Sequence, residues 1–383
     1  MVSSLTKVII KMETIHKTAL IIGAGPGGLA TSKIFVDKNI DHFVLERGPL
    51  IADSWRKFYD SLTLHTGKHL SVLPGMKFKK ETFLFPPKSQ FLNYMENYTE
   101  TYKLPIKVST DVTKIEKGEK GVWVVHTEGN IYSCDYLVIG IGLAPFPFVP
   151  EIEGLDNFKG QIYHSIKYKN PESLKGKNCL VIGAGNSGAE IAYELSQEGI
   201  DTTIFIRSGA NVSPLHILGV PIQYIGYLMS IFPKWFQLFF ISMSNFFNDL
   251  VEGGPLIPRP SYSPLDRPPI IGKKFSKALK KGLIKYKNKI TSYKENGVCF
   301  EGNEFKEIDT IILATGFKVN FNIFSHKVDR DETGFAKRKN RVEDFDHHNL
   351  FYVGQNYDST GGLVNIHKDS QIIGKKIEEM IKS

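Results

Sequence analysis

Cysteine is scarce in this chain, which has three among its 383 residues: Cys134, Cys179 and Cys299. They are far apart in sequence, so a disulfide framework is excluded and a reducing, cytosolic environment is expected. All three lie in apolar, strand-like runs. We therefore expect them to be buried packing residues rather than reactive groups.

A long uninterrupted apolar run is missing as well. Residues 217–247 contain one charged residue, Lys234, but Pro221 and Pro233 interrupt the stretch. Two short helices separated at Pro233 therefore fit better than one membrane-spanning helix. The many aromatic side chains of this stretch suit a pocket wall, a protein interface such as a homodimer, or a peripheral membrane contact, and these three interpretations stay open. Since no signal-peptide pattern precedes it, we expect a cytoplasmic protein, with peripheral attachment to a membrane as the alternative.

Positive charge exceeds negative charge, but no long basic block is present. The formal net charge is +8, and the densest basic group lies within residues 337–341. We interpret this group as a solvated loop, and because no nucleic-acid motif accompanies it, no nucleic-acid partner is expected. His347 and His348 are adjacent but have no partner at metal-binding spacing, so no metal site is expected.

Glycine, in contrast, forms two GxGxxG fingerprints: Gly23, Gly25 and Gly28, then Gly183, Gly185 and Gly188. Each fingerprint follows a short apolar run and precedes an apolar helical pattern. In that context the first glycine permits a tight turn and the second lets the backbone approach a pyrophosphate at a helix N-terminus. The third lets the helix pack on the strand. Two such units predict two dinucleotides bound by one chain.

The residues that follow each fingerprint predict which dinucleotide is bound. Glu46 lies about 20 residues after the first fingerprint, where an acidic side chain accepts hydrogen bonds from ribose hydroxyls. Arg207 lies at the matching point after the second, where an arginine favours a 2′-phosphate. The first unit is therefore predicted to bind FAD and the second NADP. The further candidate cofactor-binding residues are Arg47 for FAD and Asn186, Ser187 and Ser208 for NADP.

The order of these units predicts an α/β flavoprotein with two Rossmann-like domains, the NADP domain being inserted into the FAD domain. A chain of this length suits two domains. We assign an N-terminal extension to residues 1–17, a discontinuous FAD-binding domain to 18–157 and 305–383, and an NADP-binding domain to 158–304 with an apolar helical insertion at about 215–250. Because doubly wound sheets bind ligands at the carboxyl ends of their strands, the two cofactors should face each other.

The connector before the second unit carries a more specific pattern, FxGxxxHxxxY, formed by Phe158, Gly160, His164 and Tyr168. With the two fingerprints and the ATGF string that contains Thr315 and Gly316, it resembles the identifying sequence of the class B flavin-dependent monooxygenases. The resemblance covers nearly the whole chain. It implies FAD and NADPH as cofactors and molecular oxygen as a second substrate. The disulfide-reductase branch of related flavoproteins needs a close cysteine pair, which is missing here. We interpret His164 as a hinge residue in an exposed linker, with an interdomain hydrogen bond as the alternative.

Residues 54–78 and 83–98 look like the plant YUCCA enzymes, flavin monooxygenases that convert indole-3-pyruvate to indole-3-acetate. This resemblance implies that Trp55 and residues 59–68 lie beside the flavin, and it makes His65 and Lys68 the candidate catalytic residues. Many flavin-containing monooxygenases have asparagine where this chain and the YUCCA type have His65. After Arg207 and Ser208 the chain departs from the family's usual continuation, so its substrate pocket is expected to differ.

A late glycine pair precedes the final helical pattern, which runs from about residue 362 to 382. Gly361, Gly362 and Leu363 are candidates for contact with the flavin, because the positive end of a helix there would stabilise charge on the reduced cofactor. A plain helix cap is the alternative.

The predicted activity follows from the cofactors. NADPH reduces FAD, the reduced flavin forms a C(4a)-hydroperoxyflavin with oxygen, and a small organic substrate is oxygenated while the protein keeps the site dry. The resemblance favours oxidative decarboxylation of an aryl α-keto acid such as indole-3-pyruvate. The alternatives are an N- or S-oxygenating flavin-containing monooxygenase, an NADPH oxidase or reductase without productive oxygenation, and a non-catalytic cofactor-bound sensor. The complete connector pattern argues against the second, and the intact fingerprints argue against the third.

Overall fold

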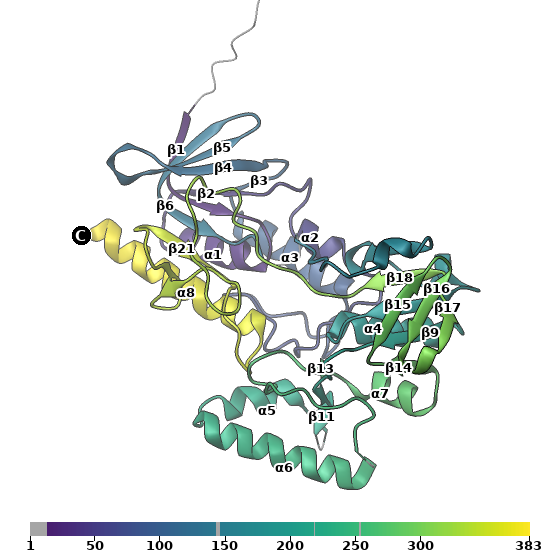
Figure 1. Cartoon of the computed structure of the whole chain (residues 1–383). Helices are drawn as coiled ribbons and strands as arrows, with labels where there is room; N and C mark the ends of the chain where they lie inside the picture. The colour runs from purple at the N-terminus through teal and green to yellow at the C-terminus, as the bar shows by residue number, and fades with distance from the viewer. Residues whose placement is uncertain (1–13, 143–145, 218, 253) are drawn as a thin grey trace, which may run out of the picture.

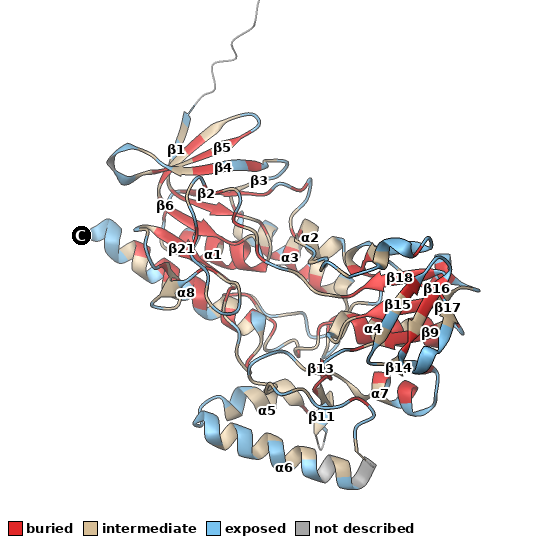
Figure 2. Ribbon diagram, viewed as in Figure 1, coloured by how far each residue is buried: buried red, intermediate tan, exposed pale blue. Residues whose placement is uncertain are grey.

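The computed structural model of this protein describes residues 14–142, 146–217, 219–252 and 254–383. Two large sheets, each covered by its own helices, form the two halves of the molecule, and a pair of helices lies apart from both (Figure 1). The sheets hold the interior of the protein, since buried residues are concentrated on their strands (Figure 2).

The first sheet has nine strands, and its central strands β21-β6-β1-β2-β3 are parallel. Its strands are β1 Thr14–Ile22, β2 His42–Leu45, β3 Ile106–Lys107, β4 Val112–Lys117, β5 Trp123–Thr127, β6 Ile131–Ile139, β19 Arg338–Lys339, β20 Glu343–Asp344 and β21 Leu350–Tyr352. The second halves of β1 and β6 are continuous buried runs, as is typical of parallel strands covered on both faces. Helices α1 Pro26–Asp37, α3 Lys88–Tyr102 and α8 Gly362–Lys382 contribute to the core on one face. The β4–β5 hairpin and residues 319–336 pack on the other.

The second sheet has five parallel strands in the order β14-β9-β8-β18-β7. These strands are β7 Gln161–His164, β8 Asn178–Ile182, β9 Asp201–Phe205, β14 Ile284–Lys287 and β18 Thr310–Leu313. Helices α4 Asn186–Gln197 and α7 Lys273–Lys280 contribute to the core on one face. An antiparallel sheet of β15 Ile290–Lys294, β16 Gly297–Phe300 and β17 Phe305–Glu307 packs on the other. The predicted fold of two Rossmann-like units, one inserted into the other, is confirmed.

The apolar stretch forms two helices, α5 Ile222–Met229 and α6 Lys234–Glu252, separated at Pro233 as predicted. Short pairings connect it to the rest of the chain: β10 Val212–Ser213 with β13 Ile270–Ile271, and β11 His216–Ile217 with β12 Val220–Pro221. Among the helices of the described ranges, none is long and apolar enough to cross a membrane. Much of the outer side of the pair is exposed (Figure 2). The exposed large apolar residues of this segment include Ile231, Trp235 and Phe239.

Two boundaries differ from the sequence prediction. Residues 14–17, assigned to an N-terminal extension, form the start of β1 and pair with β6; the rest of that extension lies outside the described residues. Residues 305–313, assigned to the FAD-binding domain, form β17 and β18, which pair with strands of the second unit. Neither boundary could be predicted from the apolar pattern alone, because strand pairing depends on residues that are far apart in the sequence.

The basic group within residues 337–341 is not a solvated loop, so that interpretation was wrong. The side chain of Arg338 is 10% exposed and forms an ion pair with Asp331. Arg341 pairs with Asp369, which is fully buried. Both guanidinium groups are held by partners that lie elsewhere in the sequence. The burial of the cysteines was predicted more accurately than the exposure of the basic group. Cys134 and Cys179 are buried on central strands, and Cys299 is half-buried.

Candidate active site

The first glycine of each fingerprint is required by a turn at the carboxyl end of a strand. Gly23 has φ +99°, and a Cβ there would lie 2.7 Å from the carbonyl oxygen of Gly140. Gly183 has φ +141°, and a Cβ there would lie 2.1 Å from the carbonyl oxygen of Ala314. The two loops therefore share a geometry that excludes any side chain.

The second and third glycines differ in what surrounds them. A Cβ on Gly28 or Gly188 would lie 1.8 or 2.7 Å from the carbonyl oxygen of the first glycine, so each helix packs directly on its turn. A Cβ on Gly25 or Gly185 would meet nothing within 4 Å. These residues cap the N-termini of α1 and α4 without a side-chain hydrogen bond. The open space at a helix N-terminus fits a pyrophosphate, so both loops fit a dinucleotide.

The first fingerprint borders a cavity of about 520 Å³, here called the first cavity. Glu46, which follows β2, lines it and is 8% exposed. Its carboxylate accepts hydrogen bonds from the backbone N–H groups of Ala24, at 2.7 Å, and Gly48, at 2.9 Å. Two carboxylate oxygens have further lone pairs that can accept from ribose hydroxyls. Arg47 lines the same cavity, as expected for a cofactor-binding residue.

The second unit presents its candidate residues differently. Arg207 and Ser208 follow β9 and are exposed, so a phosphate can reach the guanidinium group. Asn186 is held in place, because its Oδ1 accepts from Ile271 N–H at 2.7 Å and its Nδ2 donates to the carbonyl oxygen of Pro269 at 3.0 Å. Ser187, the next residue on α4, lines the first cavity. Helix α4 therefore contributes to both halves of the site.

A second cavity of about 480 Å³ lies between α5, α6, the proline-rich loop of residues 264–269 and the start of α8. Its walls are mostly apolar and include Ile222, Met229, Phe240, Ile241, Leu265 and Pro268. His65 and Asn186 line both cavities. The two spaces therefore meet at these two side chains.

His65 forms a polar contact that joins the two units. Its Nε2 contacts one carboxylate oxygen of Glu190 on α4, and the other oxygen accepts a hydrogen bond from the hydroxyl of Tyr59. Burial, and the neighbouring carboxylate of Glu190, raise the pKa of Tyr59 well above its ordinary value, so the phenol stays neutral and donates. Glu190 was not among the residues predicted from the sequence. The available signal was its position four residues after Asn186, on the same helix face.

Lys68 has partners away from the cavities. Its ammonium donates to the carbonyl oxygens of Lys80, at 2.8 Å, and Thr82, at 2.7 Å. Neither cavity includes Lys68 among the described residues that line it. This geometry suits the anchor of a loop better than a group that acts on substrate. Trp55, in contrast, lines the first cavity and packs edge-on against Phe91, with ring centroids 4.8 Å apart.

His164 is 5% exposed at the end of β7, so its interpretation as part of an exposed linker was wrong. The strand is part of the second sheet and buries the ring. The Nε2 atom lies 2.9 Å from the carbonyl oxygen of Gly316, and Nδ1 accepts from Ile166 N–H at 3.2 Å. Burial lowers the pKa of His164. Both contacts suit a neutral imidazole that donates from Nε2, and Thr315 likewise holds the backbone, donating to Phe148 O at 2.5 Å.

The other residues of the connector are packing residues. A Cβ on Gly160 would lie 2.4 Å from the ring of Phe158, which explains the spacing of the first two positions. Tyr168 is buried and donates to Glu194 Oε2 at 2.7 Å. Burial and that carboxylate raise the pKa of Tyr168 above its usual range. Of the described residues that line the two cavities, none belongs to the connector pattern.

The start of α8 borders the second cavity through Gly361 and Gly362. Gly361 has φ +97° and caps the helix without a side-chain hydrogen bond, so its first N–H groups are available to a ligand. Leu363 is buried in the core of the first sheet and does not line either cavity. Of the three candidates, two therefore border a cavity.

Comparisons with known proteins agree with this geometry. The family model described as pyridine nucleotide-disulphide oxidoreductase matches residues 20–215. The chain is 31% identical over 318 residues to the probable indole-3-pyruvate monooxygenase YUCCA9 of Arabidopsis thaliana, covering 79% of this chain and 75% of that protein. A flavin-containing monooxygenase from Stenotrophomonas maltophilia superposes with a TM-score of 0.76 at 17% identity, over 96% of this chain and 99% of that one.

Cyclohexanone monooxygenase from Rhodococcus sp. Phi1, solved with bound NADP+, superposes with a TM-score of 0.72 at 18% identity, over 97% of this chain and 85% of that one. The two structural likenesses show the fold. The similarity to the plant relatives, at 31% identity over 79% of this chain, also shows the family to which the chain belongs.

Proposed function

Since the chain belongs to the class B flavin-dependent monooxygenases and is close to the YUCCA enzymes, we propose that its first cavity holds the flavin of FAD and its second cavity the substrate. The protein is an oxidoreductase that uses FAD and NADPH. The observation that carries the proposal is the meeting of the two cavities at His65 and Asn186. A substrate in the second cavity would lie beside the reacting edge of a cofactor in the first.

Bound FAD would accept a hydride from NADPH and would then activate molecular oxygen for transfer to the substrate. The chain's own residues bind and orient. The fingerprint loops of Gly25 and Gly185 would hold the two pyrophosphates, and Glu46 the ribose of FAD. Exposed Arg207 would select NADPH by its 2′-phosphate. The apolar walls of the second cavity would exclude water from the reacting atoms.

His65 and Glu190 would order the junction between the cavities. Glu190 holds the imidazole through Nε2 and is itself held by the hydroxyl of Tyr59. A histidine fixed in this way presents its other nitrogen in one orientation. We assign to His65 the role of a hydrogen-bonding partner for substrate or for the oxygen-bearing edge of the cofactor, and we assign Lys68 no part in the reaction.

An aryl α-keto acid is the proposed substrate class, with oxidative decarboxylation as the reaction. The curated relatives are named indole-3-pyruvate monooxygenases. A cavity of about 480 Å³ with aromatic and aliphatic walls has room for a bicyclic aromatic group. The inner side of α6, with Gln237, Phe240 and Ile241, forms part of this wall. Contact of the exposed outer side with a membrane or a second copy stays a prediction.

The test is turnover of purified, FAD-loaded protein with NADPH, oxygen and indole-3-pyruvate. We expect indole-3-acetate to form in proportion to the NADPH consumed, with little hydrogen peroxide. Stopped-flow absorbance of NADPH-reduced protein mixed with oxygen should show a transient species before oxidised flavin returns. Hydrogen peroxide equal to the NADPH consumed, with no product from keto acids, amines or thioethers, would instead identify an NADPH oxidase.

A further inference from the structure

One loop connects the two cavities. Residues 354–362, here called the bridging loop, follow β21 and lead into α8. Gly354 lines the first cavity, whereas Asp358, Ser359 and Gly361 line the second. The loop therefore contributes to the walls of both cavities.

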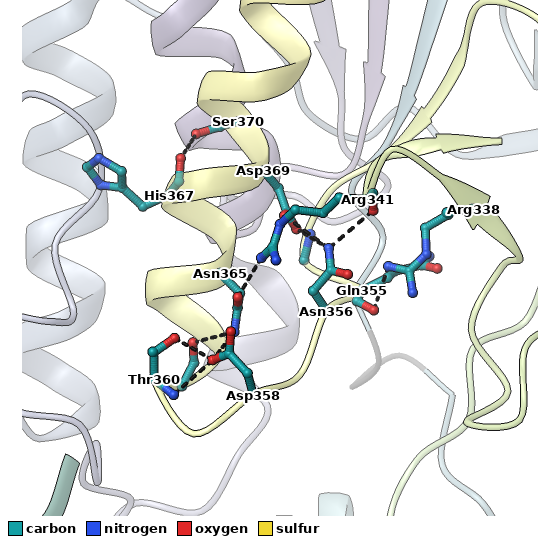
Figure 3. Close-up of polar contacts among 12 residues, drawn as sticks. Arg338, Arg341, Gln355, Asn356, Asp358, Thr360, Asn365, His367, Asp369 and Ser370 are labelled. Atoms are coloured by element: carbon teal, nitrogen blue, oxygen red, sulfur yellow. Dashed lines mark hydrogen bonds and ion pairs between the residues drawn. The ribbon is translucent and has the colours of Figure 1, made fainter. Parts of the chain in front are cut away.

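Asp369, on α8, holds the first half of the bridging loop. It is fully buried, yet three groups donate to its carboxylate, two of which, Arg341 and Asn356, can be followed in Figure 3. Oδ2 accepts from Gly354 N–H at 3.0 Å, and both oxygens accept from Asn356 Nδ2 at 3.0 Å. Oδ1 also accepts from Arg341 Nε at 2.6 Å. The charge of Asp369 is thus compensated inside the protein, and the contacts it makes reach the lining of the first cavity.

Arg341 extends the same network to the second half of the loop. Its Nη2 donates to Asn365 Oδ1 at 2.5 Å (Figure 3). The amide nitrogen of Asn365, a fully buried residue, then donates to Asp358 Oδ1 at 2.9 Å and to the carbonyl oxygen of Gly361 at 3.1 Å. Asp358 and Gly361 line the second cavity. Hydrogen bonds therefore connect the ion pair of Arg341 and Asp369 to both ends of the bridging loop.

Arg341 adopts a backbone conformation that side chains rarely have, with φ +76°. Such a conformation persists where the surrounding contacts determine it. Here the side chain is held by Asp369 and Asn365, and the carbonyl oxygen accepts from Asn356 Nδ2 at 3.3 Å. The network thus fixes both the loop that carries Arg341 and the bridging loop.

We propose that Asp369 is a positioning residue for both cavities, acting with Arg341 through the bridging loop. It touches neither cavity itself. It holds Gly354 on one side and, through Arg341 and Asn365, Asp358 and Gly361 on the other, so it fixes the first and second cavities relative to each other. The inference rests on the proposed function in placing FAD in the first cavity, but it concerns binding rather than the reaction, so it is measured without turnover.

The test compares two buried carboxylates. In Asp369→Asn the side chain keeps its size, but Arg341 loses its counter-ion and Gly354 N–H a charged acceptor. The matched control is Asp344→Asn, because Asp344 is also buried and accepts from Tyr352 and His347, outside the bridging loop. The apoprotein of each variant is titrated with FAD, and the midpoint potential of the bound flavin is measured.

We expect Asp369→Asn to raise the Kd for FAD at least about tenfold, relative to both wild type and Asp344→Asn. The midpoint potential of the bound flavin should shift in Asp369→Asn alone, because Gly354, which lines the first cavity, loses the charged acceptor that holds its N–H. A general loss of packing at a buried carboxylate would affect Asp344→Asn in the same way. Equal effects of the two variants, or an unchanged potential in Asp369→Asn, would overturn the proposal.

A milder variant decides the matter if Asp369→Asn does not fold. Asn356→Ala keeps the ion pair but removes the amide that joins Asp369 to the carbonyl oxygen of Arg341. The Kd for FAD should rise about threefold or more, and Asn340→Ala, on the neighbouring exposed turn, should leave it unchanged. An unaltered FAD affinity in Asn356→Ala would also overturn the proposal.

Discussion

Within each fingerprint, the second glycine serves the binding of a cofactor, whereas the third glycine serves folding. Gly25 and Gly185 have open space where a Cβ would lie, whereas Gly28 has a carbonyl oxygen at 1.8 Å. A methyl group is therefore tolerated by the fold at the second glycine of each fingerprint, but there it occupies the place of a pyrophosphate. At the third glycine it forces the helix away from its turn.

From this difference we expect Gly25→Ala to fold but to lose FAD, with Kd raised about tenfold or more. Gly185→Ala should stay yellow and show the same loss for NADPH. The control, Gly28→Ala, should lower the melting temperature of the apoprotein, which the other two leave within a few degrees. Flavin absorbance of the purified proteins and thermal unfolding measure both effects. Loss of FAD in Gly185→Ala would contradict the assignment of the two loops.

Arg207 is expected to distinguish NADPH from NADH. Removal of a charge-assisted phosphate contact costs about 2 kcal/mol, so Arg207→Ala should raise the KM for NADPH roughly thirtyfold. The KM for NADH, which has no 2′-phosphate, serves as the internal control and should change little. Steady-state oxidation of both coenzymes gives the measurement, and a similar rise for both would remove Arg207 from the phosphate site.

His164 makes stability depend on pH. Burial lowers the pKa of His164 in the folded state, so below its ordinary value of about 6.5 the unfolded chain binds a proton that the folded chain refuses. The free energy of unfolding should therefore fall as the pH drops from about 7 to 5. His164→Gln, which keeps a donor for Gly316, should reduce the slope by up to about one proton. His42, whose pKa burial also lowers, accounts for part of the remaining slope.

A residue could be predicted from the sequence when its contacts lie close to it in the chain. Gly23, Gly25 and Glu46 act within one βαβ unit, where spacing alone determines geometry. The burial of His164 and the pairing of Arg341 depend on segments more than 20 residues away, which spacing does not reveal. Lys68 was chosen by resemblance, and its partners, Lys80 and Thr82, show why a motif position need not reach the site.

Among the elements, α4 has two tasks on neighbouring turns. Glu190 faces the junction of the cavities and holds His65 and Tyr59, whereas Glu194, one turn later, holds Tyr168. Both are carboxylates that accept from a tyrosine. The pair therefore separates an effect on the site from an effect on the helix.

We expect Glu190→Gln to lower the yield of oxygenated product per NADPH several-fold, because His65 loses its charged partner at the junction. FAD content should be unchanged. Glu194→Gln should leave the product yield as in wild type. Simultaneous assay of NADPH, product and hydrogen peroxide measures the yield. An equal loss in both variants would mean that α4 packing, rather than the His65 contact, is responsible.

Helices were predicted more completely than the short strands. The break at Pro233 and the span of α8 follow from proline chemistry and a long apolar period, which are local signals. Strands β19 and β20 have two residues each, β20 pairs with the edge of β21, and β19 pairs with β20, so no local pattern predicts them. Their position explains why Arg338 is buried.

On the scale of the whole molecule, the two nucleotide-binding units share one boundary. The contact of His65 with Glu190 crosses from the first unit to the second, and Asn186 lines the first cavity although it belongs to the second fingerprint. Flavin in the first cavity would therefore order side chains that belong to, or contact, the second unit, which is predicted to bind NADP. Two ligands that bias the same contact must affect each other's affinity by equal factors.

We therefore expect FAD to tighten the binding of NADP+ about fivefold or more, which corresponds to a coupling free energy of about 1 kcal/mol. Calorimetric titration of NADP+ into apoprotein and into FAD-loaded protein measures the factor, and the reverse titration must return the same value. In Glu190→Gln the coupling should shrink toward zero, because the contact that joins the units is weakened, while each ligand still binds alone. Equal affinities of NADP+ for the apoprotein and the loaded wild-type protein would show that the units act independently. The shared side chains would then be neighbours in space without energetic consequence.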